Sequence, residues 1–163
     1  MADQRFVGKK VVVIGGNSGI GLATAAAFDR EGAHVAIVGR NPETLEQARL
    51  ALSPSATAFR ADVSNLAELD ELAVALARDM GRVDVLFANA GLGAMVPFDE
   101  VTEKGWDDLM NVNLKGMYFS VQNFAPANPR PYDDTGWTVQ LMRNVDVRVV
   151  ADKAVQTQPM TLL

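Results

Sequence analysis

Cysteine is absent from the 163 residues, and histidine occurs only once, as His34. Without cysteine the chain has no disulfide framework, thiolate nucleophile or cysteine zinc site. A lone histidine in an apolar run leaves no histidine pair for a metal, so we expect no metal site. The composition fits a reducing compartment, and we predict a cytoplasmic location.

Positive charge is also scarce, and so is sequence that would place the chain in a membrane. The 15 Lys and Arg residues are outnumbered by 20 Asp and Glu residues, and the net charge of −5 disfavours binding to nucleic acid. With 48% hydrophobic residues the chain has enough apolar material for one globular core but too little for a membrane protein. The N-terminus does not resemble a secretory signal, because Lys9 and Lys10 precede only a short apolar run.

Short apolar runs alternate with helical patterns up to about residue 124. The predicted strands are 10–14, 35–38, 57–61 and 83–88, and the predicted helices are 22–30, 42–52, 66–80 and 103–124. Asn41, Asn65 and Thr102 stand where they would cap helices, and Gly32 and Gly81 where they would end them. Strands and helices that alternate in units of about 30 residues indicate a parallel sheet with right-handed crossovers.

A glycine-rich segment joins the first strand to the first helix. Gly15 permits a tight turn out of the strand, Gly19 lets the backbone approach a diphosphate, and Gly21 lets the helix pack closely. The free N–H groups of the first helical turn then face an anion. The spacing is Gly-x-x-x-Gly-x-Gly, not the commonest dinucleotide fingerprint, so a glycine-rich turn without a ligand is the alternative.

Several short motifs stand in a fixed order along residues 7–122. They are Gly15-Gly16-Asn17-Ser18-Gly19-Ile20-Gly21, Asp62-Val63, Ala88-Asn89-Ala90-Gly91 and Asn111-Val112-Asn113-Leu114. In order and spacing they resemble the motifs of the short-chain dehydrogenase/reductase family. The resemblance implies a Rossmann fold and an oxidoreductase that uses NAD(P). The chain departs from the commonest family pattern at Ile14, where Thr is frequent, and at Ala88, where Asn is frequent.

The end of the second predicted strand reads Gly39-Arg40-Asn41. In a dinucleotide site an acid about 20 residues beyond the glycines usually holds the ribose 2′-hydroxyl of NAD. Here no carboxylate repels a 2′-phosphate, and the Arg40 guanidinium can form charge-assisted hydrogen bonds with one. We therefore expect NADP(H) to be preferred over NAD(H). The alternative is that Arg40 is an ordinary surface arginine beside a helix start.

Polar residues follow the third and fourth predicted strands. Asp62 can accept a hydrogen bond from the adenine amine beside the Val63 backbone, or it can cap the helix that follows. Asn89 can tie neighbouring loops while Ala90 and Gly91 let the cofactor ribose come close, or this segment can be a plain turn. The predicted cofactor-binding residues are Gly15, Asn17, Ser18, Gly19, Ile20, Gly21, Arg40, Asp62, Val63, Asn89, Ala90 and Gly91.

Asn113 lies within a strongly apolar helix, where an amide lowers helix propensity and needs partners if buried. In the resembling family this asparagine kinks the helix and holds a water in a proton relay. Asn113 is therefore the one residue of the family's catalytic set that we find in the chain. The alternative is a hydrogen bond from one helix to another.

The rest of that catalytic set is missing. The family uses a serine and a Tyr and Lys four residues apart, because a nearby cation lets the tyrosine act as an acid. Gln122 stands four residues after Tyr118, and Gly136 stands four after Tyr132. Lys115 and Tyr118 are three residues apart and offer only a non-standard site. Whether the chain is an enzyme is therefore open.

The pattern changes after residue 124. Residues 126–163 resemble a non-catalytic segment of zinc-carboxypeptidase-like proteins, without zinc ligands. A short helix at 135–142 and a strand at 145–150 are predicted there, and the strand is expected to complete the sheet. The predicted α/β fold is a Rossmann-like doubly wound parallel sheet, truncated after the fifth helix, with a divergent C-terminal helix and strand. Residues 1–124 form its dinucleotide-binding domain, and residues 125–163 form the divergent segment.

Three functions fit these patterns. The first is an NADP(H)-binding domain of a short-chain dehydrogenase/reductase-type oxidoreductase without turnover. The second is an active NADP-dependent carbonyl reductase or alcohol dehydrogenase with a non-standard site, and the third is a chimera or fragment with only a structural role. The family also uses the helix at 103–124 in its subunit interface. Its apolar face must be covered, either by the segment after residue 124 or by another chain, and in the second case we expect a homo-oligomer through this helix. That face comprises Trp106, Met110, Leu114, Met117 and Val121.

Overall fold

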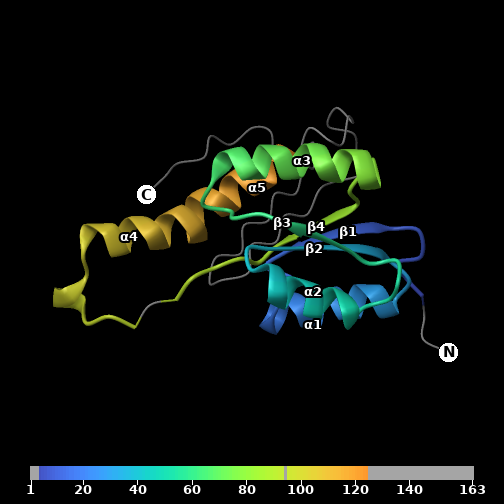
Figure 1. Ribbon diagram of the computed structural model, residues 1–163, viewed down its shortest axis with the longest axis horizontal. Coiled ribbons are helices and arrows are strands. Elements are labelled where there is room, and N and C mark those ends of the chain that lie inside the picture. The colour runs from blue at the N-terminus through green and yellow to red at the C-terminus, as the bar shows by residue number, and fades with distance from the viewer. Residues whose placement is uncertain (1–3, 94, 125–163) are drawn as a thin grey trace, which may run out of the picture.

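The computed structural model describes residues 4–93 and 95–124, which form a four-stranded parallel sheet with helices on both faces (Figure 1). The strands are β1 (Lys10–Ile14), β2 (His34–Gly39), β3 (Thr57–Arg60) and β4 (Val85–Ala88). The α-helices are α1 (Gly19–Arg30), α2 (Pro42–Leu50), α3 (Leu66–Met80), α4 (Glu103–Met110) and α5 (Met117–Phe124), with a 3-10 turn η1 (Phe98–Glu100) and a π-helical segment η2 (Asn111–Gly116).

Side chains of β1 alternate between two apolar layers because successive strand residues point to opposite faces. Val11 and Val13 pack in the layer covered by α1 and α2, whereas Val12 and Ile14 pack in the layer covered by α3 and α5 (Figure 1). All four are at most 1% exposed. The predicted α/β, doubly wound parallel sheet is therefore confirmed for the described residues.

The strand order β3-β2-β1-β4 determines where a ligand crevice can form. The chain moves from β1 outward to β2 and β3, and then crosses back so that β4 pairs with the other side of β1. The loops that leave β1 and β4 therefore diverge, and a crevice opens between them at the carboxyl edge. Ligands of open α/β sheets bind at such a point.

The predicted helix caps at Asn41, Asn65 and Thr102 are confirmed. Asn41 Oδ1 accepts the N–H groups of Glu43 (2.9 Å) and Thr44 (3.1 Å). Asn65 Oδ1 accepts the N–H of Ala67 (3.1 Å), and Thr102 Oγ1 accepts that of Gly105 (3.1 Å). Gly32 and Gly81, at the predicted helix ends, have positive φ angles of 85° and 72°.

Some predicted boundaries were wrong by two or three residues. The first helix begins at Gly19, three residues earlier than predicted, because the glycine segment already turns into it. The fourth strand begins at Val85 rather than at residue 83. Asp84 precedes it, and its N–H donates to the Lys10 carbonyl (2.8 Å) in the turn that enters the strand.

The predicted helix at 103–124 is interrupted by the π-helical segment η2. The interruption coincides with a close approach of this helix to the segment after β3. A Cβ at Gly116 would lie 2.5 Å from the Val63 carbonyl oxygen, so only glycine fits there. Single π-helical turns within longer helices frequently occur at functional sites, and Asn113 lies in this one.

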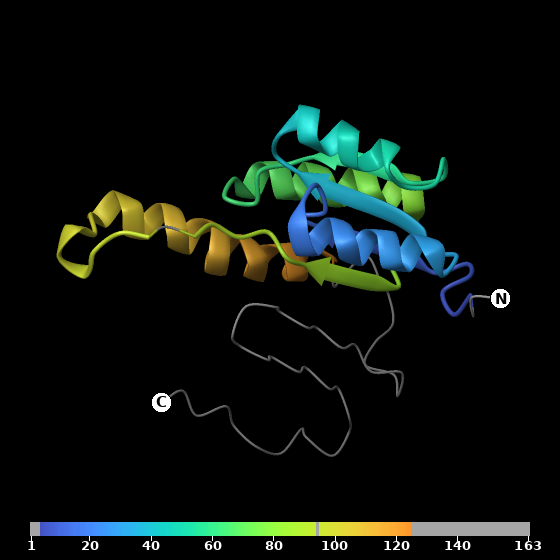
Figure 2. The same cartoon turned by 90° about the horizontal axis from the view of Figure 1, so that it is seen from below.

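The loop after β4 and helix α4 extend beyond the sheet (Figure 2), and residues 95–108 are all exposed. No residue of α4 is buried. Of the apolar face expected to be covered, Met117 is buried, but Trp106 and Leu114 are 54% and 64% exposed. The described residues therefore do not cover this face.

No helix in the described part of the chain is long and apolar enough to cross a membrane. The predicted helix at 135–142, the predicted strand at 145–150 and the resemblance over 126–163 lie outside the described residues.

Candidate functional site

A cavity of about 400 Å³ lies at the carboxyl edge of the sheet, between the loops that follow β1 and β4. All but one of the predicted cofactor-binding residues line it, the exception being Gly21. The predicted residues in its wall are Gly15, Asn17, Ser18, Gly19, Ile20, Arg40, Asp62, Val63, Asn89, Ala90 and Gly91. The fold thus brings together, at one crevice, residues that are separated in the sequence by up to three strands.

Glycine is required in the loop after β1 because other parts of the backbone approach it closely. Gly15 has a φ of 77°, and a Cβ on it would lie 2.8 Å from the Ala90 Cα. A Cβ on Gly21 would overlap the Gly15 carbonyl oxygen and lie 3.0 Å from the Asn89 amide nitrogen. Gly21 therefore acts by close packing against this loop and does not line the cavity.

The amino end of α1 differs from those of α2, α3 and α4. Ser18 precedes α1 in an extended conformation and forms no side-chain cap, whereas the other three helices are capped by Asn or Thr. The first N–H groups of a helix have no acceptor within it. At α1 these groups and the positive end of the helix dipole therefore face the cavity edge, and no described side chain caps them, as an anion site requires.

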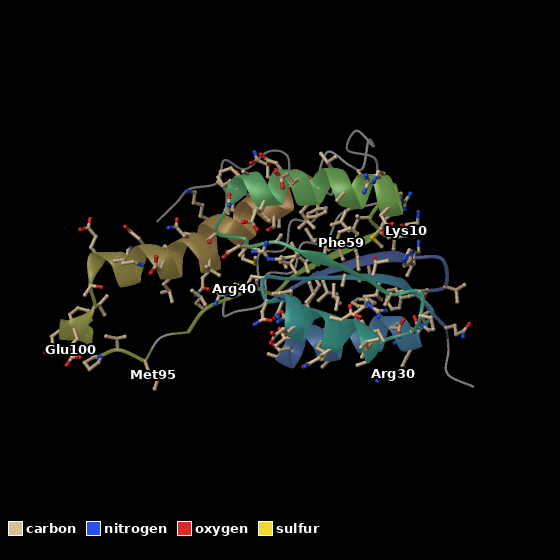
Figure 3. The ribbon with its side chains drawn as sticks, viewed as in Figure 1. Lys10, Arg30, Arg40, Phe59, Met95 and Glu100 are labelled. Atoms are coloured by element: carbon tan, nitrogen blue, oxygen red, sulfur yellow. The ribbon has the colours of Figure 1, made fainter. Side chains whose placement is uncertain are left out.

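The end of β2 carries an exposed Arg40, which lies at the opposite end of the sheet from Lys10 (Figure 3). Beside it, Asn17 Nδ2 donates to Thr44 Oγ1 (2.9 Å), and a Cβ on Gly39 would lie 2.7 Å from Asn17 Oδ1. The Asn17 side chain therefore fills the space above Gly39 and ties the glycine loop to α2.

Asp62 does not cap α3, so the alternative prediction is wrong: Asn65 caps that helix, and Asp62 closes a local turn ahead of it. Its Oδ1 accepts the N–H (2.9 Å) and the hydroxyl (2.7 Å) of Ser64, and Oδ2 has no hydrogen-bond partner in the described residues. Partial burial raises the pKa of the Asp62 carboxyl, but the bonds from Ser64 and the charges of Arg40 and Arg60 outweigh it. The net pKa is lowered, so this carboxylate is ionised at neutral pH.

Asn113 joins the π-helical segment to the loop after β4. Its Oδ1 accepts the Leu92 N–H (2.7 Å), and its Nδ2 donates to the Leu92 carbonyl (2.8 Å). The alternative prediction, a hydrogen bond between two helices, is therefore wrong, because the partner is a loop. A Cβ on Gly91 would lie 3.3 Å from Asn113 Oδ1, so this contact also fixes the wall of the cavity.

The side chains of Lys115 and Tyr118, which were considered for a non-standard reaction centre, and that of Ser120 lie away from the cavity. Tyr118 is 62% exposed and its ring contacts Phe119 edge-on at 5.4 Å. Lys115 is also exposed. Ser120 is buried, and its hydroxyl donates to the Gly116 carbonyl (2.7 Å) within the helix. None of these side chains lines the cavity.

Sequence reasoning missed Arg60, the last residue of β3. In the sheet it is the register partner of Gly39, and its Nε donates to the Arg40 carbonyl at 3.4 Å. The signal that could have revealed it is the strand register, which pairs residues twenty-one positions apart.

A second hollow, of about 340 Å³, lies at the other end of the sheet. Here Asp84 Oδ1 forms ion pairs with Arg82 Nη2 (2.5 Å) and Lys9 Nζ (3.8 Å). Lys10 Nζ donates a hydrogen bond to the Met80 carbonyl. Because these cations are paired with a carboxylate or a helix-end carbonyl, the cluster serves to join β1, β4 and α3.

The profile of the family described as short chain dehydrogenase matches residues 9–131. The chain belongs to this short-chain dehydrogenase family. It is 42% identical over 125 residues to oxidoreductase asL5 of Sarocladium schorii, a match that covers 77% of this chain and 50% of that protein. It is 35% identical over 121 residues to gluconate 5-dehydrogenase of Gluconobacter oxydans, covering 72% of this chain and 47% of that enzyme.

Solved structures of short-chain dehydrogenase proteins share the fold. The 3-ketoacyl-(acyl-carrier-protein) reductase of Brucella melitensis, solved in complex with NADH, matches with a TM-score of 0.72 and 31% identity, over 74% of this chain and 50% of that one. The chain therefore spans about half the length of the relatives that it matches. The family match extends to residue 131, somewhat beyond the resemblance seen in the motifs.

Proposed function

We propose that this chain binds NADP(H) in the cavity at the carboxyl edge of the sheet, as the nucleotide-binding part of a short-chain dehydrogenase-type oxidoreductase. The observation that carries the proposal is the uncapped amino end of α1 on a glycine loop that opens into this cavity. A Cβ on Gly19 would meet no atom within 4 Å, which leaves room for a ligand against the backbone. A diphosphate group fits a site of this kind.

The residues around the cavity suit successive parts of a dinucleotide. The N–H groups of Gly19 and Ile20 would hold the diphosphate, and the Asp62 carboxylate would accept the adenine amine through its free Oδ2. Asn89 and the small residues after it would leave space for a ribose. When bound, the nicotinamide group would supply or accept a hydride.

NADP(H) is proposed over NAD(H) because of the residues at the end of β2. No carboxylate lies at residues 39–41, and Arg40 lines the cavity without an ion pair to any described carboxylate. A guanidinium in this position favours a 2′-phosphate over a 2′-hydroxyl. The NADH in the Brucella reductase belongs to that protein and does not decide the choice here.

We propose further that the 163 residues, as they stand, bind the cofactor without turnover. The Tyr-Lys pair and serine of the resembling family have no counterpart in the sequence, and Asn113 is engaged with Leu92. Protonation of an alkoxide at the hydride-accepting carbon therefore lacks a positioned acid.

Calorimetric titration with NADPH and NADH side by side tests the proposal. We expect saturable binding of both, tighter for NADPH, and no consumption of NADPH on a broad panel of carbonyl compounds. Turnover would favour the alternative of an active enzyme with a non-standard site. If neither dinucleotide binds, the chain is left with a structural role, as expected of a chimera or fragment.

Two finer proposals accompany this function. The apolar side chains exposed on α4 and on the segment after it, including Trp106 and Leu114, favour association of two copies through residues 103–124. Sedimentation equilibrium would detect it, and a monomer at all concentrations would contradict it. The lack of cysteine suits a cytoplasmic location.

A further inference from the structure

Two arginines from different strands lie close together at the carboxyl edge of the sheet: Arg40 lines the cavity, and Arg60 lies beside it, outside the lining. Arg40 follows β2 directly, and Arg60 ends β3 opposite Gly39 in the parallel register. The Arg60 Nε donates to the Arg40 backbone carbonyl at 3.4 Å, so the Arg60 side chain crosses toward Arg40 at the carboxyl edge. Both residues are exposed, so the Arg60 side chain has no packing that would hold it away from a ligand bound at Arg40.

Neither arginine of this pair forms an ion pair within the part of the chain that the structure describes. Ion pairs in the described residues engage Arg5, Lys9, Arg49, Arg82 and Lys104, but neither Arg40 nor Arg60. The charges of both arginines act on the Asp62 carboxylate, whose Oδ1 accepts two hydrogen bonds from Ser64. Two like charges held together with one shared carboxylate repel each other, and an added anion relieves that repulsion.

The charge of the expected ligand matches two cations better than one. A phosphate monoester carries between one and two negative charges at neutral pH, with three acceptor oxygens. One guanidinium fork can satisfy two of those oxygens, which leaves charge and an acceptor for a second donor. A 2′-phosphate bound to Arg40 would present these on the side of the neighbouring strand β3.

We infer that Arg60 is a second specificity-determining residue for NADP(H), which contacts the 2′-phosphate together with Arg40. The inference rests on the proposed function and adds to it a residue from another strand. Discrimination between the two cofactors is then shared by β2 and β3. If Arg60 contacts the 2′-phosphate, its loss should weaken only ligands that carry this group, because a ribose with a free 2′-hydroxyl offers the guanidinium no anion. If Arg60 only attracts negative charge in general, its loss should weaken all anionic ligands.

The test is a calorimetric comparison of NADPH with NADH and of 2′,5′-ADP with 5′-AMP, on the full chain and its variants. For Arg60→Gln we expect affinity for NADPH and 2′,5′-ADP to fall about tenfold or more, while affinity for NADH and 5′-AMP stays within about twofold. Arg60→Lys keeps the charge but not the fork and should lose less. Arg78→Gln, which removes an exposed arginine from α3, is the matched control and should change none of the four affinities.

The outcomes separate the inference from the proposed function. If the wild-type chain binds both dinucleotides and Arg60→Gln changes neither, or weakens both equally, Arg60 does not read the 2′-phosphate and the inference is wrong. If the wild-type chain binds neither dinucleotide, the proposed function fails and the inference fails with it. Circular dichroism of Arg60→Gln and Arg60→Lys establishes that a loss of affinity is not unfolding. A loss in the folded variants that is confined to NADPH and 2′,5′-ADP, the two ligands with a 2′-phosphate, supports the inference.

Discussion

Asn113 and Leu92 exchange two hydrogen bonds, in which one side-chain amide satisfies both the N–H (2.7 Å) and the carbonyl (2.8 Å) of a loop residue. The pairing closes the wall of the cavity after β4 against the π-helical segment. The Asn113 amide therefore has a structural role, and in a proton relay it would have to act while it holds Leu92.

Replacing Asn113 with Leu removes both bonds and leaves two partly buried backbone groups unpaired. We expect the free energy of unfolding to fall by about 2–4 kcal/mol, measured by urea denaturation. Amide hydrogen exchange at Leu92 should accelerate. Lys115→Ala, an exposed change in the same segment, is the control and should alter stability by less than about 0.5 kcal/mol. Unchanged exchange at Leu92 in Asn113→Leu would contradict the structural assignment.

Gly19 and Gly8 form a matched pair for testing the glycine loop. Both have positive φ angles, 52° and 73°, and a Cβ on either would meet no atom within 4 Å. Alanine should therefore cost each about 1–2 kcal/mol of stability through backbone strain. Only Gly19 lines the cavity, so Gly19→Ala should also weaken NADPH binding, whereas Gly8→Ala should not. Equal affinities of Gly19→Ala and Gly8→Ala for NADPH would show that Gly19 does not contact the cofactor.

Arg40→Asp should reverse the cofactor preference. A carboxylate there repels a 2′-phosphate and can accept a hydrogen bond from the 2′-hydroxyl of NAD(H). We expect NADPH affinity to fall at least about tenfold and NADH affinity to hold or rise, as measured by calorimetry. A ratio of the two affinities that does not change from wild type would count against a 2′-phosphate at this arginine.

Asp84 predicts a pH dependence of stability. Its side chain is 12% exposed and accepts the Lys10 N–H (3.0 Å) and the Arg82 guanidinium. Burial raises the pKa of the Asp84 carboxyl, but these bonds and the charges of Arg82 and Lys9 lower it more, and the result lies below the usual 3.8. A lowered pKa in the folded state means that ionised Asp84 stabilises the fold above that value.

Asp84→Asn should therefore destabilise the chain by about 1–3 kcal/mol at neutral pH. The difference from wild type should shrink as the pH falls below 3.8, through the lowered pKa of the folded state. Denaturation curves at several pH values measure this. Asp79→Asn, at an exposed position on α3, is the control. A difference that stays constant down to the lowest pH would show that the carboxylate charge is not the cause.

Local signals in the sequence predicted the elements, because each one acts within a few residues. Asn41, Asn65 and Thr102 cap their helices through bonds that span two or three positions. The apolar runs of β1 and β2 are short and rich in β-branched residues, which favours a buried strand over a helix. The roles of Gly15 and Gly21 could be predicted from the sequence because a glycine is needed wherever two backbone segments approach too closely for a Cβ atom.

What could not be predicted depends on partners distant in the chain. Arg60 lies in the short segment Thr57–Arg60, which carries no sign of a ligand, and only its register with β2 brings it beside Arg40. The π-helical turn at Asn113 interrupts a pattern that reads as one continuous helix, and the Leu92 bonds that accompany it come from a loop twenty-one residues earlier.

The Asn17–Thr44 hydrogen bond has a consequence for anyone who wishes to re-engineer this protein. Since that amide occupies the volume a side chain at position 39 would need, exchanging the stretch from 39 to 44 for another dehydrogenase's sequence would dislodge Asn17 and distort the neighbouring glycine turn. In the proposed cofactor site, the residues that would set the cofactor preference and the loop that would hold the diphosphate are therefore mechanically coupled. A graft of residues 39–44 must carry position 17 with it.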